Sequence, residues 1–275
     1  MTILVFSLIV LFGAVAAGFI GSLTGLGGGA VIIPLLTVLL GVDIHYAIGT
    51  ALVSVIATSS GSAAAYVKEG ISNIRLGMFL EIATTVGAVL GTVVAAFVPT
   101  NVVAVVFGLV LIFNGVNSFL KKEVNSNIES SRLAIWLKLP GTYPTSNGIT
   151  KYGIVNVVGG FVMMVVAGVL SGLLGIGSGA FKVIAMDNIM KVPFKVSTTT
   201  SNFMMGVTAT ASAVVYLQRG YIEPGLCMPV VIGVLLGAML GAKILVKSNV
   251  KNLRVFFAIV IMLLALNMIY KGLYH

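Results

Sequence analysis

The chain carries the same glycine-rich apolar element twice, at positions 150 residues apart. Residues 17–30 read AGFIGSLTGLGGGA and residues 167–180 read AGVLSGLLGIGSGA, with seven of the fourteen positions identical. The same spacing, without a gap, later pairs Tyr66 with Tyr216. An internal sequence repeat that extends this far without a gap indicates duplication of a long unit, so the fold must be built from two related halves.

Composition decides what surrounds those halves. Hydrophobic residues make up 59% of the chain and charged residues 8%, against about 25% charged residues in a soluble domain. The surface must therefore face lipid, where only helices and closed barrels satisfy the backbone. Long apolar runs, without alternating strands, favour helices. The net charge of +9 fits basic cytoplasmic loops better than a nucleic-acid partner. The sequence predicts an all-α polytopic membrane protein.

Each copy is expected to hold five apolar segments. They are Ile3–Ser22, Ala30–Leu40, Ala47–Val67, Leu76–Val98 and Val102–Leu120, then Tyr152–Gly172, Ala180–Met190, Val196–Leu217, Ile222–Leu245 and Leu253–Tyr270. The second segment of each copy rises only about 16 Å, so it is predicted to cross half the membrane directly after the glycine-rich element. The segment before it either crosses fully or forms the other arm of a re-entrant hairpin.

Loop charge predicts how the two copies are oriented. Lys182 lies within a short segment, and the other fifteen basic residues lie in loops or at segment ends. An odd number of crossings per copy splits these thirteen against two, whereas an even number splits them nine against six. The positive-inside rule favours the odd count and hence two inverted repeats. Residues 1–121 are then repeat 1, residues 122–150 a cytoplasmic connector and residues 151–275 repeat 2. Both termini are predicted to be extracytoplasmic, in the cell membrane.

The connector contains two recognisable stretches. SRLAIWLKLP reads as a short interfacial helix, with Trp136 and Leu137 facing lipid, or equally as a plain linker. GTYPTSNG reads as a turn-rich loop.

The glycine-rich elements are the first candidates for a binding site. Glycine lets the chain leave a helix and bring its backbone close to a ligand, and a helix that starts within the membrane presents N–H groups suited to an anion. The alternative is close packing of helices, which is favoured for Gly87, Gly91, Gly237 and Gly241. The candidate substrate-binding residues here are Gly25, Gly27, Gly28, Gly29, Gly175, Gly177, Ser178 and Gly179.

Lys182 sharpens the case for an anion. It lies three residues after Gly179, and Ile32 stands at its place in the first copy. A membrane-buried ammonium needs a cavity or a partner; its alternatives are to snorkel to the interface or to pair with Asp187.

Hydroxyl and amide groups that could bind an oxyanion recur at the third segments. The best candidates are Thr50, Thr200, Ser201 and Asn202.

Two carboxylates within the spans are candidates for ion coupling. Glu81 is the first, unless it simply pairs with Arg75, and Asp187 is the second. The sequence shows no cluster typical of a metal site and no nucleophile with a base, so neither a cofactor nor an enzyme is expected. The single cysteine, Cys227, excludes an internal disulfide.

Four stretches carry a family resemblance. They are GFIGSLTGLGGGAVIIPLL and AIGTALVSVIATSSGSAAAY in the first copy, then AGVLSGLLGIGSGAFKV and STTTSNFMMGVTATASAVVYLQRGYI in the second. The chain resembles the sulfite exporter TauE/SafE family of membrane permeases over nearly its whole length. The resemblance implies a transporter of sulfur-containing anions, often in export. The chain departs from the first-copy pattern where Gly28 becomes Ser178 and where Lys182 appears.

These observations together predict a secondary transporter of small anions. Sulfite or an organosulfonate is the expected substrate and export the expected direction, with a proton or sodium gradient as the driving force because no ATPase domain is present. A passive anion channel is the alternative, and an intramembrane enzyme or scaffold a remote one. The expected partners are the anion, the coupling ion and the lipid bilayer, and the chain is compatible with an oligomer.

Overall fold

The chain forms a largely helical structure. The computed structural model describes residues 3–24, 27–95, 97–120, 129–145, 148–175 and 177–247, with isolated positions between 259 and 273. Gly25 and most of the expected segment Leu253–Tyr270 therefore lie outside the described residues. Within the described part, five helices are long and apolar enough to cross a membrane, which agrees with the predicted polytopic membrane protein.

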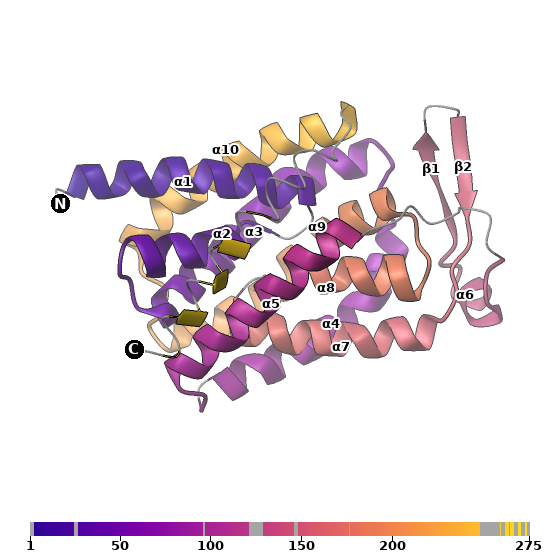
Figure 1. The fold of residues 1–275 in the computed structure, drawn as a ribbon. Coiled ribbons are helices and arrows are strands. Elements are labelled where there is room, and N and C mark those ends of the chain that lie inside the picture. The colour runs from indigo at the N-terminus through magenta and orange to yellow at the C-terminus, as the bar shows by residue number, and fades with distance from the viewer. Residues whose placement is uncertain are drawn as a thin grey trace.

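The helices follow the predicted order in both copies (Figure 1). The first copy contains α1 (Ile3–Thr24), α2 (Gly29–Pro34), the π-helical turn η1 (Leu35–Leu39), α3 (Ile44–Lys68), α4 (Ile74–Ala95) and α5 (Thr100–Leu120). The second contains α7 (Val157–Leu174), α8 (Gly179–Ile184), the π-helical turn η2 (Ala185–Ile189), α9 (Phe194–Gln218) and α10 (Pro224–Lys247).

A short helix and a π-helical turn follow the glycine-rich element in each copy. Together they span 29–39 and 179–189, within one residue of the expected short segments. Pro34 lies inside α2, but its counterpart in α8 is Ile184 and the π-turn is still present. The widened turn is thus a property of the repeated backbone and does not depend on proline.

Long helices of one copy pack along long helices of the other, in two matching pairs that we call the exchanged pairs. Helix α1 lies along α10, and α4 lies along α7, as Figure 1 shows for α1 and α10. Helices α3 and α9 pack against each other between these pairs; α3 also contacts α10, and α9 contacts α4. The contacts of α10 with α1 and α3 therefore have counterparts in those of α4 with α7 and α9, the α3–α9 contact is its own counterpart, and neither copy builds its interior alone.

Glycines bring the exchanged helices to backbone contact. A Cβ placed on Gly18 of α1 would lie 2.2 Å from the carbonyl oxygen of Val234 in α10. A Cβ on Gly168 of α7 would lie 2.2 Å from the oxygen of Thr84 in α4. These four residues match at the repeat spacing, so one contact is made twice. Glycine is required there because any side chain would separate the helices.

The connector corrects the all-α prediction. Strands β1 (Gly141–Thr145) and β2 (Gly148–Tyr152) form an antiparallel hairpin where a turn-rich loop was expected. Tyrosine, isoleucine and threonine in these strands favour extended backbone. The hairpin is fastened to the membrane helices through Tyr152, whose hydroxyl oxygen lies 2.8 Å from the amide nitrogen of Asn73 just before α4.

Two helices of this region are shorter than predicted. Helix α7 begins at Val157 instead of Tyr152, because Tyr152 ends β2 and the Asn156 side chain caps the helix at the amide of Gly159. The predicted interfacial helix is a single turn, α6 (Arg132–Trp136), in which the Trp136 side chain is 77% exposed.

Replacing Gly91 of α4 by alanine tests the close contacts. The added Cβ would lie 2.1 Å from the carbonyl oxygen of Val169 in α7, so we expect a loss of about 1–3 kcal/mol in unfolding free energy. Gly225→Ala is the matched control, because its Cβ would meet only a Glu223 oxygen at 3.9 Å. Thermal unfolding in detergent micelles measures both, and equal transition midpoints would contradict the packing role of Gly91.

Candidate functional site

The two glycine-rich elements lie against the same two side chains. A Cβ on Gly27 would lie 3.2 Å from the Met205 sulfur and 3.3 Å from Val55, and a Cβ on Gly177 would lie 2.8 Å from Val55 and 3.5 Å from Met205. Val55 on α3 and Met205 on α9 are themselves matched at the repeat spacing. The φ angles of Gly27 and Gly177, +75° and +66°, are values that glycine adopts without strain. The structure thus brings together the two elements that the sequence singled out.

The two elements differ at the residue that begins the short helix. Gly28 has an ordinary φ of −66°, whereas its counterpart Ser178 has φ +49°. A non-glycine residue in this region carries a backbone cost of order 1–3 kcal/mol. The Ser178 hydroxyl is buried and has no hydrogen-bond partner among the described residues. Strain and an unsatisfied hydroxyl thus occur together in the second copy only.

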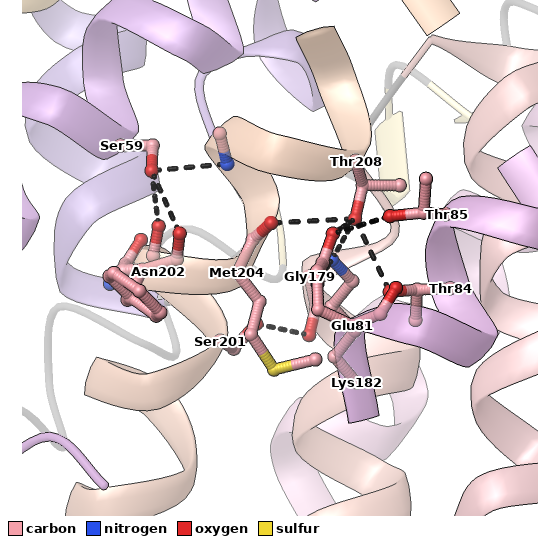
Figure 2. A network of polar contacts seen from close by, with 12 residues as sticks. Ser59, Glu81, Thr84, Thr85, Gly179, Lys182, Ser201, Asn202, Met204 and Thr208 are labelled. Carbon is pink, nitrogen blue, oxygen red and sulfur yellow. Dashed lines mark hydrogen bonds and ion pairs between the residues drawn. The ribbon is translucent and has the colours of Figure 1, made fainter. Parts of the chain in front are cut away.

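A buried ion pair lies beside the second glycine-rich element (Figure 2). Lys182 on α8 is completely buried, and its Nζ atom lies 3.4 Å from Glu81 Oε2 on α4. The ammonium donates a hydrogen bond to the Thr208 hydroxyl on α9, and this hydroxyl donates to Glu81 Oε1. Thr84 lies next to this group, 3.5 Å from Thr208 between hydroxyl oxygens. The pair therefore joins one helix of the first copy to two of the second.

Sequence reasoning identified both charges but not their pairing. Glu81 does not pair with Arg75, whose guanidinium donates instead to the carbonyl of Lys138. Lys182 neither reaches the interface nor forms its ion pair with Asp187; its carboxylate partner is Glu81. A signal was present in the repeat, because each charge stands opposite an apolar residue in the other copy.

The charged centre has no counterpart in the other half. At the repeat spacing, Ile32 matches Lys182 and Val231 matches Glu81. Only the hydroxyl is retained: Thr58 matches Thr208 and donates to the carbonyl of Ser54 on its own helix. Thr208 was not predicted from the sequence, because a threonine in a hydroxyl-rich helix usually bonds its own backbone. The two matching places in the backbone thus differ in charge, because the Lys182–Glu81 pair is present at one of them and two apolar residues stand at the other.

A side chain from α3 contacts the backbone of α9 next to this centre. The Ser59 hydroxyl donates to the carbonyl of Asn202 and accepts from the amide of Gly206, 3.1 Å away. In an α-helix these two backbone groups are the partners of one intrahelical bond. The Ser59 hydroxyl thus joins α3 to α9 two residues before Thr208.

The other predicted residues lie around the two glycine-rich elements. Ser201 donates to the carbonyl of Gly179, and the Asn202 amide donates to the carbonyl of Ser22 near the end of α1. Thr200 accepts from the amide of Asn73 at the start of α4. These contacts hold helices together, and the binding roles of the residues stay predictions.

Thr50 and Asp187 lie on elements other than those that carry the ion pair and Thr208. Thr50 faces the Cys227 thiol at an interface of α3 with α10, and Asp187 is buried on η2. Gly25 lies outside the described residues. The part of the chain that the structure describes contains no group of three or more histidine, cysteine, aspartate or glutamate residues able to hold a metal ion.

Lys182→Met tests the energetic weight of the ion pair. The change leaves the Glu81 carboxylate buried without its cation, so we expect a loss of about 3–5 kcal/mol in unfolding free energy. Adding Glu81→Gln should restore most of it, because a neutral pair needs no charge compensation. Ile32→Met at the matching position is the control and should cost under about 1.5 kcal/mol. If thermal unfolding gives Lys182→Met and Ile32→Met the same midpoint, the pair carries no such weight.

Comparison with known proteins agrees with this architecture. Residues 10–268 match the family model described as sulfite exporter TauE/SafE. The chain is 30% identical to the "Probable membrane transporter protein YunE" of Bacillus subtilis (strain 168), over 98% of this chain and 99% of that protein. It is 25% identical to the "Probable membrane transporter protein YdhB" of the same organism, over 79% of this chain and 80% of that protein. No solved structure matches the chain significantly. The chain therefore belongs to the sulfite exporter TauE/SafE family and is a multi-pass membrane transporter protein.

Proposed function

We propose that this protein is a secondary transporter of small sulfur oxyanions, sulfite or an organosulfonate, which it exports with the help of an ion gradient. The observation that carries the proposal is the completely buried Lys182, held beside a glycine-rich break in a transporter whose spans contain few charges. Ionisable residues within membrane helices are costly and mark ion or substrate pathways. A cation at this place selects for anions.

The groups around Lys182 suit an oxyanion. An ammonium carries three donors and a threonine hydroxyl one, and all can point at the oxygens of a single sulfonate or sulfite. Bonds between a charged donor and a charged acceptor are the strong ones. Lys182 and Thr208 already contact a carboxylate in this way, so an anion that replaces the carboxylate would find donors in place.

We further propose that the two copies are inverted in the cell membrane, with residues 122–150 cytoplasmic and both termini extracytoplasmic. The distribution of basic residues supports this arrangement, and so does the exchanged packing of α1 with α10 and of α4 with α7. Inverted repeats in other transporters place the substrate near the middle of the membrane, at the interface between the copies. The Lys182–Glu81 pair spans such an interface.

Transport is tested in proteoliposomes with sulfite and methanesulfonate. We expect saturable flux of at least one of these anions through the wild-type protein. The neutral variant, Glu81→Gln with Lys182→Met, loses the charge-assisted bond to the anion, so its KM should rise about 10- to 100-fold. Ile32→Met should keep wild-type kinetics. Flux of neither anion through the wild type would overturn the proposed substrate class, whereas non-saturable current without counterflow would identify a channel.

Cysteine labelling tests the inverted topology. Lys68 at the end of α3 and Gln218 at the end of α9 match at the repeat spacing, and both are exposed. In a Cys227→Ala background, a cysteine at position 68 should react with an impermeant maleimide from the cytoplasmic side, and one at position 218 from the outside. Reaction of both from the same side would show that the copies are parallel.

A further inference from the structure

The ion pair at the interface of the copies has no net charge. Lys182 contributes one positive charge and Glu81 one negative charge, and their neighbours Thr84, Thr85 and Thr208 are uncharged. An anion that binds Lys182 adds a second negative charge to the same buried place. An uncompensated charge there costs several kcal/mol, so binding requires that another negative charge leave or be neutralised.

Glu81 is the group placed to be neutralised. It is the carboxylate within 4 Å of Lys182 Nζ. Helix α7, which packs along α4, carries no titratable side chain. The remaining titratable groups on the elements packed here lie farther along their helices, by roughly 8–20 Å at the rise of an α-helix. They are Arg75 on α4, Asp187 on η2, and Lys195 and Tyr216 on α9.

We propose that Glu81 and Lys182 form a proton-dependent anion switch, in which a proton on Glu81 frees Lys182 to hold the transported anion. The inference rests on the proposed function and names the coupling ion of that same site. The proton binds a carboxylate oxygen of Glu81, and the anion takes the place of the carboxylate at Lys182 Nζ. On release the proton leaves Glu81 and the carboxylate returns to the ammonium. The site has no net charge in the paired state, and it also has none in the state that holds a proton and a monovalent anion.

Thr208 is suited to assist the exchange. Its hydroxyl accepts from Lys182 and donates to Glu81 in the paired state. A hydroxyl both donates and accepts, so it can donate to an incoming anion while the protonated Glu81 donates to it. The Gly206 amide that bonds to the Ser59 hydroxyl lies two residues before Thr208.

The missing counterpart fixes the stoichiometry at one proton for each anion. Ile32 and Val231 occupy the matching positions in the other half, so the part of the chain that the structure describes holds a single switch of this kind. A monovalent anion then moves electroneutrally, and the membrane potential does not drive it. The proton moves in the same direction as the anion, so a proton gradient assists export only when the proton concentration is higher inside the cell than outside, and the opposite gradient drives uptake.

The test measures anion binding and proton uptake together, on the purified full-length chain in lipid nanodiscs. The probes are sulfite and methanesulfonate, the latter because it stays ionised throughout. For the wild type we expect the Kd for methanesulfonate to rise with pH by about tenfold per pH unit, with one proton taken up per anion bound. Glu81→Gln mimics the protonated state, so its Kd for methanesulfonate should be independent of pH. Glu69→Gln on the exposed turn after α3 is the control and should behave as the wild type.

The outcomes distinguish failure of the proton-dependent switch from failure of the proposed anion transporter. Binding of either anion to the wild type without proton uptake overturns the switch and leaves the proposed transporter intact. Binding of neither anion overturns the proposed function, and the switch with it. The difference in proton uptake between the wild type and Glu81→Gln cancels the titration of sulfite itself. If size-exclusion chromatography shows that Glu81→Gln is misfolded, wild-type uptake alone decides, with the protein-free titration of the anion subtracted.

Discussion

Close approach of exchanged helices is the constraint on which the rest of this molecule depends. Glycines let α1 lie against the backbone of α10, and α7 against that of α4. This packing sets the position of α4 relative to α8 and α9, and thereby the 3.4 Å contact between Glu81 and Lys182. A buried ion pair tolerates little displacement, because the attraction must offset the desolvation of both charges. The centre is therefore only as stable as the helix contacts that frame it.

The two copies share their backbone packing but differ in their polar and charged side chains. Their repeated features are glycine contacts, π-helical turns and the meeting of Gly27 and Gly177 over the same two side chains. Their unrepeated features, the Lys182–Glu81 pair and the Ser59 hydroxyl bonded to the backbone of α9, both lie on or beside the second copy's helices. The packing is therefore similar in the two copies because both carry small residues at the helix contacts. The charge differs between the copies because single positions, such as Lys182 and Glu81, carry different residues in each copy.

Much of the fold could be predicted from the sequence, because membrane helices depend on long apolar runs that are visible locally. The short helices after the glycine-rich elements were expected from segment length alone. The pairing of Glu81 with Lys182 was not, since the residues are 101 positions apart and their contact depends on how α4 packs against the second copy. The hairpin was missed because its strands are only five residues long and contain Pro144, which is uncommon in strands. Thr208 was missed because its sequence context resembles that of any helical threonine.

The exchanged pairing also constrains the order of assembly in the cell. Helix α1 leaves the ribosome before α10, yet its glycine face fits α10, which follows about 200 residues later. Synthesis at 5–20 residues per second leaves α1 without that partner for roughly 10–40 s. During this interval its groove is open to lipid or to the helices of other nascent chains. Biogenesis of this transporter thus includes a waiting state, in which α1 lacks its packing partner until α10 has been synthesised.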